Sequence, residues 1–269
     1  MKTICKKSLI FSVTAGRSGS KYLANLLDAV PGVHAEHEPE PNFVHVMRRS
    51  QHNPSIALSF LRDHKLPAIS NVAEPIYAET SHLTCKGFIE PLIMLGLRPS
   101  LILLRRPPRQ VAFSQLERLT VPARTQLGLT YLLEPRDPFV IPLPGWESLT
   151  DYQLCFWYAI EIERRCLRYA AMANRLGLAL TDVTNEELNN WSIFSRLLAD
   201  LNLPTTDTVR ESHARISAQA HNLNPSKLEK PSPDELAASE EIVWNRIAYF
   251  EPLLRQDIQA RYEGGPTRT

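Results

Sequence analysis

The sequence has 269 residues, with 30 basic and 29 acidic side chains and a formal net charge of +1. This length suits one substantial domain, and the balanced charge argues against binding of nucleic acid through an overall basic field. No apolar run reaches the roughly 18 residues that a membrane-spanning helix needs.

The first predicted strand, Ser8-Leu9-Ile10-Phe11-Ser12-Val13, leads into the turn Thr14-Ala15-Gly16-Arg17-Ser18-Gly19-Ser20-Lys21, and a helical pattern follows. Two glycines let backbone N–H groups approach an anion, the helix dipole favours negative charge, and basic and hydroxyl side chains add donors. The turn is not a Walker A loop, because Gly-x-x-x-x-Gly-Lys-[Ser/Thr] is absent. The pattern predicts a phosphate-binding turn, and a strand-to-helix turn without a ligand is the alternative.

Helical and strand patterns alternate along the next part of the chain. In order, they predict a helix over 22–30, a helix over 54–65, a short strand over 83–88, a buried strand over 99–104 and a helix that begins near Pro108. Residues 121–150 contain many prolines and no clear period, which is typical of a surface excursion.

Three capping boxes mark the second half of the chain, at 150–153, 184–187 and 232–235. The pattern predicts a long helix from 151 to about Gly177, a strand over 178–183, a helix over 191–201, a loop over 205–231 and a terminal helix after Ser232. Alternating strands and helices are typical of βαβ units. We therefore expect an α/β fold with a central, mostly parallel sheet flanked by helices, in a single domain over 1–269. Ligands of such sheets bind beyond the carboxyl ends of the strands.

A second basic turn follows the strand over 99–104. The strand ends in Arg105-Arg106, and Ser114 comes eight residues after Arg106, in the next predicted helix. An arginine can bind a phosphate with two parallel hydrogen bonds, and a hydroxyl can add a third donor. Because Arg17 and Arg106 both follow strand ends, the two turns together favour a site for a nucleotide with two separate phosphates. A solvated basic turn is the alternative for this motif.

Both motifs resemble those of the sulfotransferases that use 3′-phosphoadenylyl sulfate (PAPS) as the sulfuryl donor. Gly16-Arg17-Ser18-Gly19-Ser20 is similar to the family's loop for the 5′-phosphosulfate, and the segment from Arg106 to Ser114 is similar to its 3′-phosphate motif. The resemblance extends over roughly residues 8–262, with the specific motifs in 8–30 and 99–120. It implies a P-loop-like α/β fold and PAPS as the co-substrate, with no metal.

The resemblance also implies roles for single residues. Arg17, where many relatives have lysine, would contact the phosphosulfate and stabilise charge on the leaving phosphate. The 5′-phosphate would be held by Ser18, Gly19, Ser20 and Lys21, and the 3′-phosphate by Arg106 and Ser114. Pro107 stands where relatives often have an acid, and the family's late Arg-Lys-Gly-x-x-Gly loop is absent, with residues 221–227 as a weaker candidate for its place.

A segment rich in histidine and glutamate, His34-Ala35-Glu36-His37-Glu38-Pro39-Glu40, follows the first predicted helix. In bacterial relatives a glutamate in a Glu-Pro context is the general base, so the resemblance favours Glu38, followed by His37 and Glu36. A metal site is an alternative for the segment, although its spacing matches no standard site. A zinc deaminase is excluded, because the Pro-Cys-x-x-Cys partner of the His-x-Glu motif is absent.

The acceptor side of the site has weaker signals. Glu79 and Lys86 are candidates for the border of the acceptor cavity, and an exposed acid and a surface lysine are the equal alternative. The stripe of Tyr152, Phe156, Trp157 and Tyr158 is a further candidate, although such a stripe is more often core. Loops over 40–80 and 121–150 would shape the pocket, and loop sequence does not encode the identity of the acceptor.

The cysteines, Cys5, Cys85, Cys155 and Cys166, form no C-x-x-C pair and lie in apolar contexts, which favours buried thiols and a cytoplasmic location. The basic start and short apolar run are interpreted as the first strand rather than as a signal peptide. The sequence thus favours transfer of a sulfuryl group from PAPS to a hydroxyl of a small molecule, sugar or lipid. The alternatives are a P-loop phosphotransferase that uses ATP and Mg²⁺, and a non-catalytic nucleotide-binding module.

Overall fold

The computed structural model describes residues 5–219 and 231–263. The chain forms two compact units: Met1–Arg106 with Arg165–Leu223, and Pro107–Arg164 with Asn224–Thr269. We call the first the sheet unit and the second the helical unit. The long helix α8 (Asp151–Leu176) begins in the helical unit and ends in the sheet unit. The single domain over 1–269 stays a prediction.

The sheet unit is built on five strands in the order β2-β3-β1-β4-β5, and every neighbouring pair is parallel. The strands are β1 (Ser8–Val13), β2 (Val33–Glu36), β3 (Ile76–Glu79), β4 (Ser100–Arg105) and β5 (Leu180–Thr184). The central strand β1 pairs Phe11 with Glu79 of β3 and with Leu101 of β4. This confirms the α/β class and the parallel sheet.

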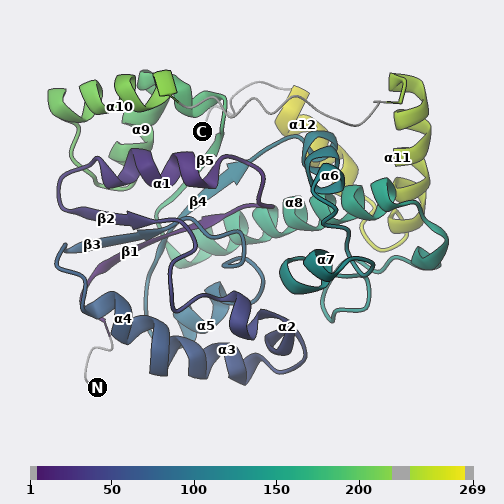
Figure 1. Cartoon of the computed structure of the whole chain (residues 1–269), viewed down its shortest axis with the longest axis horizontal. Coiled ribbons are helices and arrows are strands. Elements are labelled where there is room, and N and C mark those ends of the chain that lie inside the picture. The colour runs from purple at the N-terminus through teal and green to yellow at the C-terminus, as the bar shows by residue number, and fades with distance from the viewer. Residues whose placement is uncertain (1–4, 220–230, 264–269) are drawn as a thin grey trace. The chain divides into compact units, whose positions relative to one another are not determined.

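Helices cover both faces of this sheet (Figure 1). One face carries α1 (Ser20–Asp28), α9 (Trp191–Asp200) and α10 (Asp207–Gln219). The other carries α2 (Val44–His52), α3 (Pro54–Phe60), the π-helix η1 (Leu61–Lys65), α4 (Leu66–Ser70) and α5 (Ile89–Met94). Between α1, α9 and the sheet lies an apolar cluster that includes Leu23, Leu27, Ile102, Phe194 and Leu198. Apolar residues recur on one face of α1, so burial of that face fixes the helix on the sheet.

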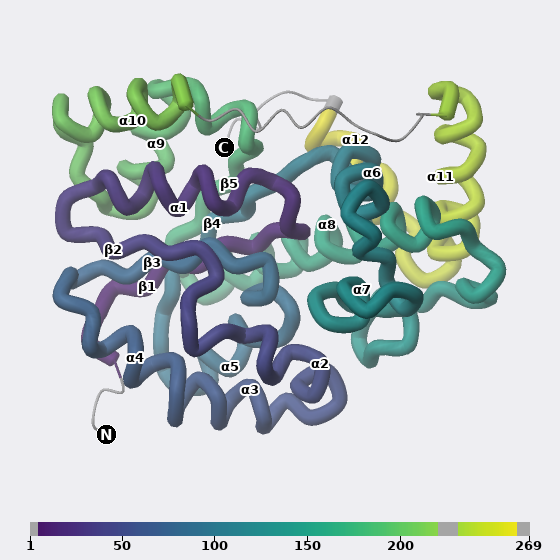
Figure 2. The backbone as a smooth tube through the Cα atoms, in the orientation of Figure 1, coloured from purple at the N-terminus to yellow at the C-terminus, as the bar shows by residue number. Residues whose placement is uncertain are grey.

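The helical unit contains α6 (Pro108–Glu117), α7 (Gln126–Tyr131), the 3₁₀ turn η2 (Trp146–Ser148), the first part of α8, α11 (Pro233–Ile247) and α12 (Leu254–Glu263), which Figure 2 traces along the chain. Arg109 forms a bidentate pair with Glu240. The stripe of Tyr152, Phe156, Trp157 and Tyr158 is 0–8% exposed, which supports its interpretation as core. No helix in the described ranges is both long and apolar enough to cross a bilayer.

Most predicted elements are present, and three predictions are wrong. Residues 121–150 are not a surface segment throughout, because they contain α7 and the buried Val121, Leu133 and Ile141. Residues 82–88 form consecutive turns rather than a strand, with helical-type bonds such as Phe88 N–H to Thr84 O at 3.2 Å. The loop predicted over 205–231 contains α10, whose polar sequence buries only Val209 and His213 among its described residues. The three capping boxes are confirmed by their reciprocal hydrogen bonds.

Candidate functional site

The turn between β1 and α1 is a loop with three residues in the left-handed region. Gly16, Arg17 and Gly19 have φ values of 76°, 59° and 83°. The buried Ser18 donates from Oγ to the carbonyl of Gly16 at 3.1 Å. Within the described residues, no side chain caps the amino end of α1 and no acid lies in its first turn. The positive end of the helix dipole therefore faces the loop, as an anion site requires.

Two close approaches explain the glycines of this loop. A Cβ atom on Gly16 would lie 3.2 Å from Cγ of His82, and one on Gly19 would lie 2.1 Å from Oδ1 of Asn185. Thr14 Oγ1, at the start of the loop, is buried without a hydrogen-bond partner among the described residues. A backbone cradle, an uncapped helix and an unsatisfied hydroxyl fit a phosphate group.

The predicted donor-site residues of the sheet unit gather around this loop. Arg17 and Lys21 are exposed, whereas Ser20 is buried. Arg106, which follows β4, donates from Nη1 to the carbonyl of Arg17 at 2.6 Å. The guanidinium of Arg106 therefore lies beside the loop. Its neighbour Arg105 is buried and forms an ion pair with the partly exposed Asp182 at 2.9 Å.

Two further predictions for the donor site concern Ser114 and residues 221–227. Ser114 lies half-buried on α6 in the helical unit. Residues 221–227 lie outside the described residues. Their assignment to the 3′-phosphate stays a prediction.

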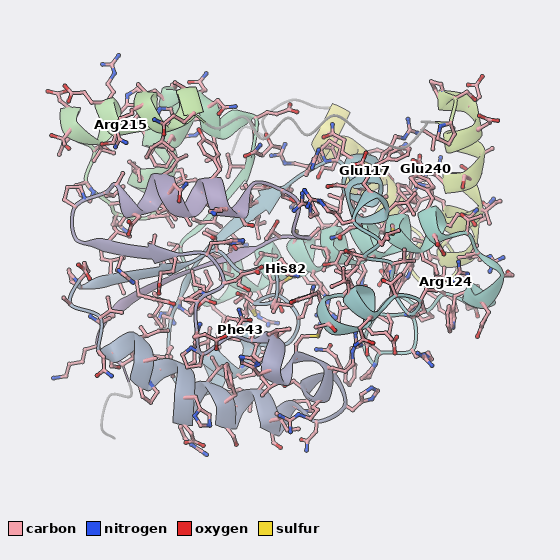
Figure 3. The ribbon with its side chains drawn as sticks, viewed as in Figure 1. Phe43, His82, Glu117, Arg124, Arg215 and Glu240 are labelled. Carbon is pink, nitrogen blue, oxygen red and sulfur yellow. The ribbon has the colours of Figure 1, made fainter. Side chains whose placement is uncertain are left out.

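Glu38 and His82 meet beside the loop. Glu38 lies in the segment after β2, with φ at 53°, and its Oε1 is 2.5 Å from Nδ1 of His82. The same imidazole packs against Gly16. His82 follows β3 and lies near the carboxyl ends of the strands (Figure 3). A carboxylate and an imidazole are thus paired next to the candidate phosphate site.

Burial and charge set the protonation states of this pair. Burial alone would raise the pKa of Glu38, but the hydrogen bond from His82 and the charges of His82, His37 and Lys86 lower it to about 2. Burial lowers the pKa of His82 to about 4, and the charge of Lys86 acts in the same direction. At neutral pH Glu38 is therefore a carboxylate and His82 a neutral imidazole. Since Nδ1 donates to Glu38, the lone pair of the ring lies on Nε2.

The other two candidates for a base make different contacts. His37 Nδ1 lies 2.7 Å from the carbonyl of Thr80. Glu36 lies 3.3 Å from His34 in a half-exposed pair on the edge strand β2. Of these three residues, Glu38 is connected to the loop, because its carboxylate bonds to His82 and the His82 imidazole packs against Gly16.

Glu79 and Lys86 are both buried, so the exposed acid and surface lysine of the alternative interpretation are wrong. Glu79 pairs with Lys65 at 2.7 Å. Burial lowers the pKa of Lys86 to about 7. Lys86 acts on the pair through its charge, since it lowers the pKa of both Glu38 and His82.

The turn that carries His82 and Lys86 is fixed from several sides. The thiol of Cys85 lies 3.6 Å from the carbonyl oxygens of Thr14 and His82. The carbonyl of Cys85 accepts hydrogen bonds from Arg165 and Tyr169, and Gln51 donates to the carbonyl of Lys86 at 2.8 Å. These contacts hold the imidazole of His82 in place against the loop between β1 and α1.

Sequence reasoning missed His82. The strand predicted over 83–88 would have placed this residue before a strand, at the wrong end of the sheet. With the strand placed at 76–79, His82 would follow its carboxyl end. The rule that ligands bind beyond the carboxyl ends of the strands would then have indicated this residue. Within the described residues, no three His, Cys, Asp or Glu side chains gather as a metal site would need.

No family model matches the sequence, and no curated protein matches it. Two solved structures are similar over nearly the whole chain. The sulfotransferase domain from the curacin biosynthetic pathway has a TM-score of 0.53 at 15% identity, covering 96% of this chain and 98% of that domain. Mouse sulfotransferase SULT7A1, solved in complex with PAP, has a TM-score of 0.54 at 11% identity, covering 94% of this chain and 89% of that one. The chain has the fold of the sulfotransferases.

Proposed function

We propose that the protein transfers a sulfuryl group from PAPS to a hydroxyl group of a small molecule, a sugar or a lipid. One observation carries this proposal: the Glu38–His82 pair lies directly against Gly16 of an anion-binding loop. A group transferred from a phosphate in the loop would meet a base at that point. The shared fold supports the proposal, and at 11–15% identity it does so as a fold alone.

The loop and Arg106 are suited to the donor. We assign the 5′-phosphosulfate to the backbone of the loop with Arg17, Ser18, Gly19, Ser20 and Lys21, and the 3′-phosphate to Arg106. Arginine forms paired, charge-assisted hydrogen bonds to phosphate. Arg17 keeps the positive charge that a developing negative charge on the leaving phosphate needs. The contribution of Ser114 to the 3′-phosphate stays a prediction of the motif.

In the reaction, the acceptor oxygen forms a bond to sulfur while the bond from sulfur to the 5′-phosphate oxygen breaks. The hydroxyl proton passes to the Glu38–His82 pair, and the Glu38 carboxylate balances the positive charge of the imidazolium. The product nucleotide PAP leaves with the negative charge that Arg17 stabilises. The pair thus extends the role that the sequence motif assigned to Glu38 alone.

Calorimetric titration with PAP, and separately with ADP and Mg²⁺, tests the donor. We expect PAP to bind without metal and ADP to bind weakly. A preference for ADP with Mg²⁺ would instead support the phosphotransferase. In P-loop enzymes, an aspartate helps to hold the Mg²⁺ ion. Strand β4 ends instead in Arg105 and is followed by Arg106, which argues against the phosphotransferase.

Transfer of labelled sulfate from PAPS to a panel of hydroxyl acceptors tests the reaction. The variant Glu38→Gln separates an enzyme from a binding module. Loss of turnover with unchanged PAP affinity is expected for the enzyme. A wild-type protein that binds PAP and transfers sulfate to none of the acceptors would support the binding module.

A further inference from the structure

A second charged pair lies behind the segment that carries Glu38. Lys65, the last residue of the π-helix η1, is 1% exposed. Its ammonium contacts three oxygens: Oε2 of Glu79 at 2.7 Å, the carbonyl of Pro41 at 3.0 Å and the carbonyl of Pro39 at 3.3 Å. A lysine ammonium has three N–H donors, so these contacts use its full capacity.

The two carbonyls belong to the segment 37–43, which has neither helix nor strand. Pro39 and Pro41 have no N–H groups and cannot fix the segment through backbone donors. Glu38 has its backbone in the left-handed region, and its carbonyl accepts a hydrogen bond from Asn42 Nδ2 at 2.8 Å. Lys65 therefore binds the chain at the residue directly after Glu38 and again two residues later.

The other partner, Glu79, is the last residue of β3 and is 1% exposed. Its Oε2 accepts from both Lys65 and the hydroxyl of Tyr77, at 2.7 and 2.9 Å. Thr80, the next residue, binds His37 through its carbonyl. Since His82 comes two residues further, one short stretch of chain holds both the imidazole and the anchor of the glutamate segment.

Stability alone does not account for this arrangement. Two charges removed from water lose hydration that their attraction only partly offsets, and replacement of such a pair by apolar groups is often neutral or stabilising. Phe43, labelled in Figure 3, has its ring 4.8 Å from the ammonium. It packs against Phe60 and Phe88, so an apolar side chain would suit the surroundings. An apolar side chain would not bind the carbonyls of Pro39 and Pro41.

We propose that the Lys65–Glu79 pair is a positioning clamp that sets the segment 37–41 so that Glu38 meets His82. The clamp is defined by the three contacts of the Lys65 ammonium. Its effect on rate rests on the proposed sulfuryl transfer, whereas its effect on the Glu38–His82 hydrogen bond does not. Lys65 and Glu79 act through Glu38 and touch no substrate.

The test uses the full chain with Lys65→Met and Lys65→Met/Glu79→Gln. The single change leaves a buried carboxylate without its counter-charge, so it lowers stability for a reason unrelated to positioning. The double change removes that charge and keeps an acceptor for Tyr77. Lys7→Met is the matched control, because Lys7 also donates to two backbone carbonyls, those of Val72 and Glu74, at the opposite end of the sheet.

The first readout is the imidazole Nδ1 proton of His82, observed by NMR and assigned by its loss in His82→Gln. A proton held in a short hydrogen bond to a carboxylate gives a low-field signal that exchanges slowly. We expect the signal in the wild type and in Lys7→Met, and its loss in the double variant with the melting temperature near that of the wild type. A double variant that keeps the signal unchanged would overturn the clamp.

The second readout is turnover against PAP affinity. Misplacement of a reacting group by about 1 Å costs on the order of 100-fold in rate. We expect turnover of the double variant to fall roughly 10- to 100-fold while PAP binds within about twofold of the wild type. Unchanged turnover with a lost NMR signal would refute the catalytic use of the clamp. A wild type without sulfuryl transfer would refute the proposed function and leave the NMR test of the clamp intact.

Discussion

Gly19 lies directly against Asn185: a Cβ atom on Gly19 would be 2.1 Å from Oδ1 of the asparagine. Asn185 follows the edge strand β5, and Gly19 precedes α1, so this contact joins the loop after the central strand β1 to the end of β5. The glycine is required both by its φ of 83° and by this approach. The shape of the anion cradle thus depends on a residue well separated from it in sequence.

Gly19→Ala should lower stability and abolish PAP binding. An L-residue in the left-handed region costs about 1–2 kcal/mol, and the contact with Asn185 adds displacement of the loop. Gly96→Ala is the matched control, because Gly96 has φ at 82° and nothing within 4 Å of its Cβ position. Urea unfolding and calorimetry should show similar backbone costs in both, with loss of PAP affinity in Gly19→Ala alone. Normal PAP binding by Gly19→Ala would refute the loop as the phosphate site.

Arg106→Ala should weaken PAP binding by about 10- to 100-fold, since a charged hydrogen bond is worth roughly 1.5–3 kcal/mol. Binding of adenosine 5′-phosphate, which lacks the 3′-phosphate, should change much less. Arg196→Ala, an exposed arginine on α9, is the control. Equal weakening of both nucleotides in calorimetry would show that Arg106 does not contact the 3′-phosphate.

Stability should rise with pH across the acid range because of the Glu38–His82 pair. The folded protein lowers the pKa of Glu38 from 4.5 to about 2 and that of His82 from 6.5 to about 4. Between its folded and its unfolded pKa, each group binds more protons in the unfolded chain than in the folded one, so acid favours unfolding. Urea unfolding between about pH 3 and pH 7 should show a flatter pH dependence in Glu38→Gln/His82→Asn. An identical slope in the variant would contradict the shifted pKa values.

Lys86→Met should shift the acid limb of the rate profile to higher pH. The lysine charge lowers the pKa of His82 and of Glu38, so its removal lets His82 hold a proton at less acidic pH. The buried amine itself has its pKa lowered to about 7, and the variant loses that desolvation cost. Turnover against pH, measured with saturating PAPS, should show the shift. If the acid limb of the rate profile lies at the same pH in the variant, the ammonium of Lys86 is too far from the Glu38–His82 pair to change its pKa values.

Sequence patterns could predict the turn after β1 and the basic turn after β4 because each of them is local. The strand–turn–helix from Ser8 to Asp28 and the basic turn after β4 are each encoded within a few neighbouring residues, and Arg106 meets Arg17 as expected from adjacent strands. Glu38 could be predicted only through resemblance to a family motif.

The Glu38–His82 pair could be predicted only in part, because the position of His82 depends on tertiary contacts. β3 is four residues long and ends in a charged residue, so the apolar pattern of Leu83, Cys85 and Phe88 favoured the wrong segment as the strand. Glu79 is buried there because Lys65, from another element, supplies its counter-charge. α10 escaped detection for a similar reason, since His213 is buried by a hydrogen bond to Leu188 O and by stacking on Phe194.

The reactivity of Cys85 can be used to measure a local opening of the protein. Its thiol lies on the turn that carries His82, where this turn contacts the start of the loop between β1 and α1. The thiol is completely buried there, and burial raises its pKa. A thiolate-selective reagent can therefore reach it only when these two segments separate, so the labelling rate measures how often that local opening occurs. Slower labelling of Cys85 with bound PAP would show that the nucleotide holds the two segments together. The labelling rate would then measure local motion at the proposed donor site.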